Sequence, residues 1–194
     1  MNKIKILIEG YAKKIEKGWL ASSTVVLVES KGKNILVDPG CNKEKLIDTL
    51  EKNGLNVEDI DYVFLTHNHV DHVLLAGIFN AKVLNNNEIF DSDKQICHNN
   101  LIPGTDLEII QTPGHSEDDC SLVVRTETGI YVIAGDVFWW MDGEEQDIDV
   151  EKVDPAHEFN HEKLVGNRKK ILQLADFVIP GHGKVFKTDL QHDP

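Results

Sequence analysis

Three histidines and one aspartate lie within six consecutive residues, in the sequence HNHVDH at positions 67–72. The segment follows the apolar run 62–65, which is typical of a buried strand. At the end of a strand the first two histidines point the same way, because side chains repeat every two residues. Residues 70–79 have the pattern of a helix, whose first turn would aim the aspartate and the third histidine at the same point. Neutral imidazole and carboxylate groups bind Zn, Fe or Mn, so this dense cluster predicts a metal site rather than a polar surface corner.

Four further residues with metal-binding side chains share one local pattern, in which a tight proline or glycine turn lies at the end of an apolar run. They are Asp38 before Pro39-Gly40, His115 after Pro113-Gly114, Asp136 after Gly135, and His182 after Pro180-Gly181. Glycine at such corners permits unusual backbone angles and close approach. Each of these residues alone is more often a turn residue or a buried histidine. If the strand ends meet at one edge of the sheets, however, all four converge on residues 67–72.

Apolar runs bounded by turn residues predict many short strands and a few helices. We expect strands at 3–9, 24–28, 34–37, 62–66, 81–84, 106–112, 121–124, 130–134 and 177–179, and helices at 43–53, 70–79 and 163–175. The tract 10–18 is polar and bounded by glycines, and the tract 141–160 is expected to be acidic and irregular. The tract 85–104 is expected to combine a short helix with loops.

The hairpins at 23–38 and 121–136 resemble each other in sequence. Aligned at a constant offset, six of their sixteen positions are identical, including the aspartate that ends each one. The similarity favours two related halves, although two apolar hairpins can also match by chance. No low-complexity linker interrupts the chain, so we expect one domain over residues 1–194.

The composition limits the classes of partner and compartment. The chain has 194 residues, 41% of them hydrophobic, and a formal net charge of −13, which disfavours binding to nucleic acid or an anionic membrane. No apolar run reaches the length of a membrane-spanning helix, and the first residues lack the core of a signal peptide. Three cysteines without C-x-x-C spacing argue against disulfides and a cysteine-rich zinc site. We therefore expect a cytoplasmic protein with a small-molecule substrate, and a homo-oligomer is allowed.

The motifs resemble, in order, those of the metallo-β-lactamase superfamily. The resemblance covers about residues 5–187, and it is carried by Asp38-Pro39-Gly40, the segment 67–72, Thr112-Pro113-Gly114-His115-Ser116, Gly135-Asp136 and Pro180-Gly181-His182-Gly183. It implies an α+β fold, a four-layer αββα sandwich with a metal site at one edge between the two sheets. It also implies two divalent metal ions, zinc in the first place with iron or manganese as alternatives.

Carried over position by position, the resemblance implies a role for each motif residue. One metal ion would be held by His67, His69 and His115, and the second by Asp71, His72 and His182. Asp136 would bridge the two ions, and Asp38 would orient a histidine from behind. No family ligand is replaced in this chain, so both metal sites are expected to be competent.

Such a pair of ions would hold a bridging hydroxide, because a bound water loses its proton near neutral pH. Asp71 would be the catalytic residue that orients this hydroxide or moves its proton. The expected reaction is the hydrolysis of a small thioester, ester or lactone. Because twelve residues follow His182, we do not expect the added domain of hydroxyacylglutathione hydrolases. The alternatives are a phosphodiesterase or ribonuclease, an iron-dependent persulfide dioxygenase-like enzyme, and a non-catalytic metal-binding module.

Three tryptophans are candidates for a substrate pocket. Trp19, Trp139 and Trp140 fall in segments that border the mouth of the site in the resembled fold, although simple packing explains them equally well. Cys120 is expected to be structural. The remaining histidines are expected at the surface: His98, His157, His161 and His192.

Overall fold

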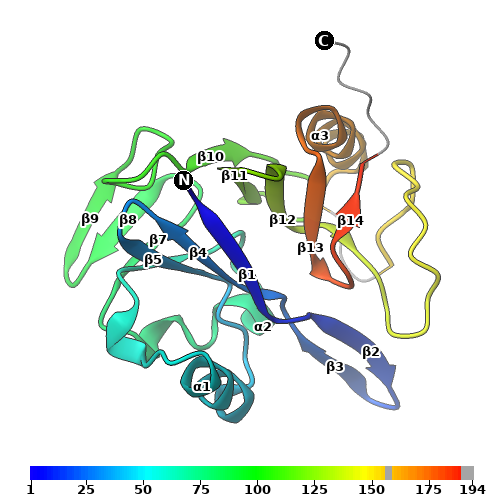
Figure 1. Cartoon of the computed structure of the whole chain (residues 1–194). Helices are drawn as coiled ribbons and strands as arrows, with labels where there is room; N and C mark the ends of the chain where they lie inside the picture. Colours follow the sequence, from blue (N-terminus) through cyan, green and yellow to red (C-terminus); the bar gives the residue numbers. More distant parts are fainter. Residues whose placement is uncertain (156–158, 189–194) are drawn as a thin grey trace.

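The first half of the chain forms a mixed sheet of seven strands, shown in blue to green in Figure 1. The computed structural model describes residues 1–155 and 159–188. The strands lie in the order β1 (Lys3–Ile8), β4 (Val25–Ser30), β5 (Lys33–Val37), β6 (Tyr62–Phe64), β7 (Lys82–Leu84), β8 (Glu88–Asp91) and β9 (Lys94–Cys97). Strand β6 lies in the middle and runs parallel to both of its neighbours, β5 and β7. Its three residues are buried, as the apolar run predicted.

The second half forms a sheet of five strands. The strands lie in the order β10 (Glu108–Gln111), β11 (Cys120–Thr126), β12 (Gly129–Trp139), β13 (Phe177–His182) and β14 (Phe186–Lys187). All neighbours are antiparallel except β12 and β13, which run parallel. Because β12 and β13 are parallel, their carboxyl ends lie at the same edge of the sheet. The predicted hairpins correspond to β4–β5 and β11–β12.

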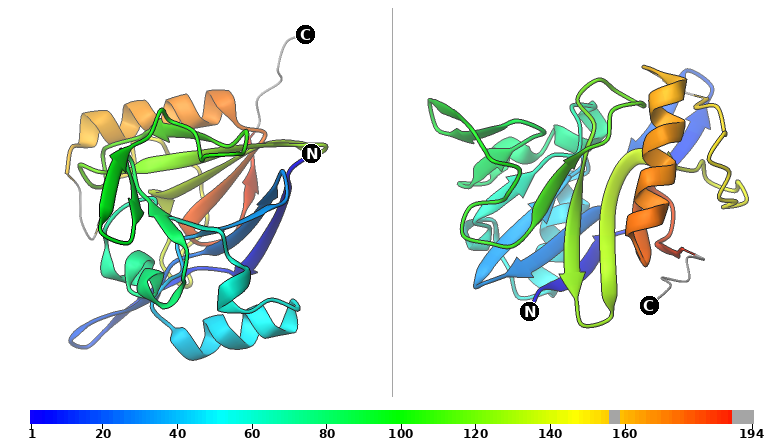
Figure 2. Two further views of the ribbon diagram at one scale, coloured as in Figure 1. Left: turned by 90° about the vertical axis from the view of Figure 1, so that its left-hand side faces the viewer. Right: turned by 90° about the horizontal axis from the view of Figure 1, so that it is seen from above.

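Helices cover the outer faces of the two sheets (Figures 1 and 2). Helix α1 (Lys43–Lys52) begins at Asn42, whose side chain accepts a hydrogen bond from the backbone N–H of Lys45. Its buried Leu46 and Leu50, one turn apart, pack on the seven-stranded sheet. Helix α3 (His161–Leu174) packs on the five-stranded sheet through a separate apolar cluster.

A third cluster of apolar side chains fills the space between the two sheets. It combines residues of both, such as Phe64 from β6 and Leu122 from β11, which are fully buried. Burying a side chain of this size contributes about 1.5–3 kcal/mol. The layers therefore follow the order helix, sheet, sheet, helix, and the predicted αββα sandwich is confirmed. Among the described residues, no helix is both long and apolar enough to cross a membrane.

Two polar tracts for which no strand was predicted in fact form hairpins. The stretch after Gly10 forms β2 (Tyr11–Ile15) and β3 (Gly18–Ser22), and the tract 85–104 contains β8 and β9 rather than a short helix. All four residues of β9 are exposed, so no apolar alternation indicates this strand. Hairpin β2–β3 forms a separate two-stranded sheet, whereas β8 and β9 are the last two strands of the seven-stranded sheet; neither tract has a regular apolar alternation.

The helix predicted over 70–79 is also wrong in length. It consists of one turn, α2 (Val70–Val73), followed by a separate short 3₁₀ helix, Ala76–Ile78. The backbone N–H of Gly40 donates to the carbonyl of His72, and the carbonyl of Gly40 accepts from the N–H of Leu75. These bonds replace the helical partners of α2, so the helix ends after one turn. A further 3₁₀ turn, Val57–Asp59, precedes β6.

Candidate metal centre

Seven side chains from both sheets meet at the edge where the strands end. Those of the segment 67–72 come from the loop after β6 and from α2, in the first half of the chain. His115 lies in the loop after β10, Asp136 lies in β12, and His182 is the last residue of β13. The structure thus brings together all the residues predicted as metal ligands. Their donor atoms form two groups.

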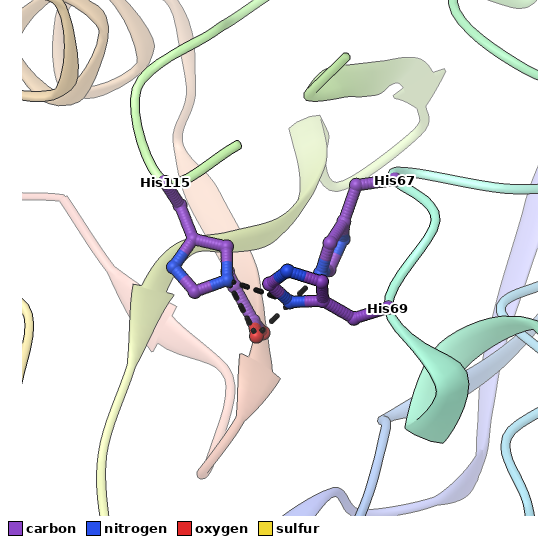
Figure 3. A group of neighbouring side chains, drawn as sticks. His67, His69 and His115 are labelled. Atoms are coloured by element: carbon purple, nitrogen blue, oxygen red, sulfur yellow. Dashed lines mark hydrogen bonds and ion pairs between the residues drawn. The ribbon is translucent and has the colours of Figure 1, made fainter. Parts of the chain in front are cut away.

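The first group contains three imidazoles and one carboxylate. One donor atom from each of His67, His69, His115 and Asp136 lies within 4.8 Å of all the others. Nε2 of His115 lies 3.0 Å from Nδ1 of His69 and 3.5 Å from Oδ2 of Asp136. Nε2 of His67 lies 3.7 Å from the same carboxylate oxygen. Figure 3 shows the three rings turned toward a common point.

The second group contains Asp71, His72 and His182, again with donor atoms within 4.8 Å of one another. Nε2 of His182 lies 3.2 Å from Oδ2 of Asp71. Oδ1 of Asp136 lies 3.3 Å from Nε2 of His72 and 3.5 Å from Nε2 of His182. The carboxylate of Asp136 therefore turns one oxygen toward each group.

Strands β12 and β13 approach unusually closely at Asp136. A Cβ atom on Gly181 would lie 1.9 Å from Oδ1 of Asp136, so any larger residue would displace this carboxylate. The backbone carbonyl of Gly181 also accepts hydrogen bonds from Thr24, which ties β13 to the other sheet. The glycine before His182 is therefore needed for space at the centre.

Asp38 lies behind the second group and orients it. Its Oδ2 atom is 2.8 Å from Nδ1 of His72 and accepts a hydrogen bond from the hydroxyl of Thr66 at 2.7 Å. Its Oδ1 atom accepts from the backbone N–H of Thr66. The hydroxyl of Thr66 lies 3.1 Å from Nδ1 of His67. Contacts at the Nδ1 atoms leave the Nε2 atoms of both imidazoles facing the centre.

Asp154 was not predicted, yet its side chain contacts the first group directly. Its Oδ2 atom lies 2.6 Å from Nδ1 of His115 and accepts a hydrogen bond from Nε1 of Trp139 at 2.8 Å. Asp154 lies in the segment 141–155, where acidic residues are so common that nothing marks this one as buried. Asp154 and His115 are far apart in the sequence, so no local pattern indicates their contact.

Burial and neighbouring charges shift the pKa values of the cluster in opposite directions. Burial, reinforced by the adjacent imidazoles, holds the pKa of His67 well below its usual range. Burial also lowers the pKa of His72 and His182, but it is outweighed by the charge and hydrogen bonds of Asp136 together with those of Asp38 at His72 and the hydrogen bond of Asp71 at His182. The pKa of His72 is raised well above its usual range, and that of His182 rises to about 9. Conversely, these two histidines lower the pKa of Asp136 despite its burial.

The donor set fits a bound metal cation. Nε2 of His67, Nε2 of His72 and Oδ1 of Asp136 are buried and have no hydrogen-bond partner within the described part of the chain. Leaving such atoms unpaired costs free energy, and native proteins rarely do so. A cation in each group would satisfy these atoms, Nε2 of His67 in the first group and Nε2 of His72 with Oδ1 of Asp136 in the second. Imidazole and carboxylate ligands suit zinc, iron or manganese.

A cavity of about 330 Å³ opens over both groups. Trp19 and Trp139 form part of its wall, with ring centroids 6.2 Å apart in an edge-to-face arrangement. Its other lining residues are Ala12, Ala21, Cys41, His69, Val70, Asp71, His115, Asp136 and His182.

Trp140 does not line this cavity, so the suggested pocket of three tryptophans needs correction. Trp140 is buried, its Nε1 atom donates to the carbonyl of Asp147, and its ring packs against Phe138 and Phe186. Neighbouring residues of an extended chain point to opposite sides, so Trp139 and Trp140 cannot face the same cavity.

Cys120, His98 and His161 do not line the cavity. Cys120 is fully buried and its thiol contacts the carbonyls of Leu65 and Thr66, as expected of a structural cysteine. His98 and His161 are half-buried rather than fully exposed. His157 and His192 lie outside the described residues.

Comparison with known proteins decides the family. A family model described as "Metallo-beta-lactamase superfamily" matches residues 18–83. Metallo-beta-lactamase domain-containing protein 1 of Xenopus laevis is 31% identical over 197 residues, which cover 95% of this chain and 81% of that protein. The chain belongs to the metallo-β-lactamase superfamily.

Other members of the superfamily are more distant in sequence. A protein of Methanocaldococcus jannaschii named probable metallo-hydrolase is 28% identical, with 87% of this chain and 91% of that protein covered. A solved structure described as a probable metal-dependent hydrolase from Staphylococcus aureus has a TM-score of 0.71 at 16% identity, covering 93% of this chain and 89% of that one. The structure of AidC, described as a dizinc quorum-quenching lactonase, has a TM-score of 0.65 at 18% identity. The match covers 90% of this chain and 78% of that one. The two structures establish the shared fold.

Proposed function

We propose that this member of the metallo-β-lactamase superfamily is a dinuclear metal-dependent hydrolase of small thioesters, esters or lactones. The observation that carries the proposal is the carboxylate of Asp136, which turns one oxygen toward each of two groups of imidazoles. A carboxylate shared in this way suits two adjacent cations better than one. The dizinc lactonase and the metallo-hydrolase named above support the same reading.

The residues of the chain would divide the work between holding metal and moving a proton. Two divalent ions, when bound, would supply a water of lowered pKa and a Lewis acid for the oxygen of the scissile carbonyl. Contacts at Nδ1 of His72 and His115 hold their Nε2 atoms toward the centre. Asp71 lines the cavity and its side chain is 28% exposed, so its carboxylate can reach a substrate and hold or move a proton.

The cavity wall favours an uncharged substrate. Trp19, Trp139 and Val70 supply apolar surface, and no lysine or arginine is among the described residues that line the cavity. A phosphodiester would bring a negative charge, which the proposed metal ions could meet but for which the wall offers no lysine or arginine. A carbonyl ester, thioester or lactone brings none.

Metal quantification followed by a substrate panel tests the proposal. The purified protein should contain two divalent ions per chain and should hydrolyse uncharged thioesters, esters or lactones in preference to bis-p-nitrophenyl phosphate. Phosphodiester cleavage without acyl hydrolysis would instead identify a phosphodiesterase. One iron per chain with oxygen uptake on a persulfide would identify a dioxygenase. A metal-loaded protein without any activity would identify a binding module.

The variant His69→Ala separates the metal centre from the rest of the fold. Loss of one imidazole from the first group should reduce hydrolysis to background, while the circular dichroism spectrum stays that of the wild type. His98→Ala is the matched control, because His98 lies in the distant β8–β9 region and bonds to the carbonyl of Asn85. Wild-type turnover in His69→Ala would refute the proposal.

A further inference from the structure

Asp154 is a buried carboxylate that contacts two different parts of the site. Its side chain is completely inaccessible to solvent. The same oxygen that lies 2.6 Å from Nδ1 of His115 accepts the indole N–H of Trp139 at 2.8 Å. One atom thus links a histidine of the first metal group to the wall of the cavity. Burying a carboxylate costs several kcal/mol unless it is paired, so these contacts are what make its position tenable.

The acidic loop, defined here as residues 141–155, is fastened so that Asp154 stays in place. Arg168 of α3 is 4% exposed, and its guanidinium donates to the carbonyl of Val137 in β12. It also donates to the carbonyls of Val150 and Lys152, just before Asp154. A rigid arginine fork that holds backbone carbonyls fixes the path of this loop onto the sheet. The hydrogen bonds of Arg168 therefore hold the loop, and Asp154 with it, in a defined position.

In each metal group an aspartate contacts Nδ1 of one histidine, and the two aspartates come from different parts of the chain. In the second group, Asp38 lies 2.8 Å from Nδ1 of His72 and leaves Nε2 facing the centre. In the first group, Asp154 makes the equivalent contact with His115. A carboxylate that accepts from Nδ1–H fixes the tautomer and the ring orientation, and it makes Nε2 a better metal ligand.

We infer that Asp154 is a positioning residue that presents Nε2 of His115 to the first metal ion and at the same time holds Trp139 at the cavity wall. The inference rests on the proposed metal centre but not on the identity of the substrate. It assigns a function to the acidic loop, which couples the geometry of a metal ligand to the surface that a substrate would touch.

The variant Asp154→Asn tests the inference by metal affinity. Asparagine keeps the size of the side chain but loses its charge, and its neutral amide oxygen is a weaker acceptor for Nδ1–H of His115 than the carboxylate. We expect zinc affinity at one of the two sites to fall about 10- to 100-fold, measured by competition with a chelator, while the other site stays close to the wild type. The visible absorption spectrum of the cobalt-substituted protein should change as well. Asp147→Asn is the matched control, because Asp147 is an exposed residue of the same loop.

The possible results distinguish a failure of this inference from a failure of the proposed function. Wild-type affinities at both sites in Asp154→Asn would overturn the inference alone. A wild-type protein that binds no divalent metal would overturn the proposed function and the inference together. With saturating zinc, the variant should still show a raised KM, because a neutral amide oxygen holds the indole N–H of Trp139 less firmly than the carboxylate does. An unchanged KM would remove Trp139 from the inference.

A measurement on the wild type covers the case in which Asp154→Asn does not fold. Nitrogen-15 NMR of the zinc-loaded protein reports which ring nitrogen of His115 carries the proton. We expect the proton on Nδ1, facing Asp154, and the metal on Nε2. The opposite tautomer would overturn the inference.

Discussion

Among single residues, Asp119 shows how burial changes the chemistry of a carboxyl group near the metal groups. Asp119 is 2% exposed and accepts hydrogen bonds from the backbone N–H and the hydroxyl of Ser116, next to His115. Burial disfavours its charged form more than these bonds favour it, so its pKa rises to about 6. The protonated form of Asp119 is therefore retained to a higher pH in the folded chain than in the unfolded one.

This shift predicts how the stability of the metal-free protein depends on pH. Between about pH 4 and 6 the folded state binds the proton of Asp119 more tightly than the unfolded state does. The contribution of Asp119 to the free energy of unfolding is thus greatest below pH 3.8 and is lost as the pH rises through about 6. At 1.36 kcal/mol per pKa unit the loss is about 3 kcal/mol. Urea denaturation of wild type and Asp119→Asn across this range measures it.

The difference between the two proteins isolates Asp119, because the histidines titrate in both. The stability of Asp119→Asn relative to the wild type should improve as the pH rises from 4 to about 6. Parallel stability curves would show that Asp119 has an ordinary pKa in the folded protein.

Among the elements, the hairpin β2–β3 uses one of its two faces to form a wall of the cavity. Trp19 and Ala21 lie on the same face of β3, and Ala21 pairs with Ala12 of β2; all three line the cavity. Leu20 points to the opposite face and is 54% exposed. The hairpin contacts α2, which carries Asp71, so it lies beside the metal groups and not in the core.

Removing the tryptophan of this hairpin should weaken substrate binding without disturbing the metal groups. We expect Trp19→Ala to raise KM about tenfold and to change kcat little, because a wall contact is made equally in the ground state and the transition state. Leu20→Ala is the matched control, since it removes apolar surface from the other face of the same strand. Steady-state kinetics on the best substrate of the panel would decide; a fall in kcat at unchanged KM would contradict the role given to Trp19.

The sequence predicts an element well where the local pattern of apolar residues matches the side chains that the fold buries. The hairpins β4–β5 and β11–β12, helix α1 and the turns that carry His115 and His182 were predicted because burial and alternation coincide there. The short helix α2 was overestimated, since its end is set by backbone bonds to Gly40 from a distant loop. Asp154 and the two exposed hairpins could not be predicted, because only packing through space defines their roles.

At the scale of the whole molecule, each metal group combines residues from both sheets. The first group takes His67 and His69 from one half and His115 and Asp136 from the other. The second takes Asp71 and His72 from one half and His182 from the other. A bound ion would therefore connect the two sheets, in addition to the apolar core between them.

Metal binding should accordingly raise the thermal stability of the protein. An ion at one hundred times its dissociation constant stabilises the folded state by about 2.7 kcal/mol per site. For a chain of this size that corresponds to a rise in Tm of about 5–10 °C per ion. Calorimetry of the chelator-treated protein, with and without added zinc, measures the rise. His182→Ala should show a smaller one, and a Tm independent of metal would contradict a link between the sheets.

The imidazole of His72 lies between two aspartates, one from each of the similar hairpins. Asp38 lies 2.8 Å from its Nδ1 atom, and Asp136 lies 3.3 Å from its Nε2 atom. Local hairpins can form early during synthesis, but neither half contains a complete set of ligands. The full centre can assemble only after the ribosome has passed His182 and the two sheets have docked. Tight metal uptake would therefore be a late event in the life of the nascent chain, and it would mark the molecules that have finished folding.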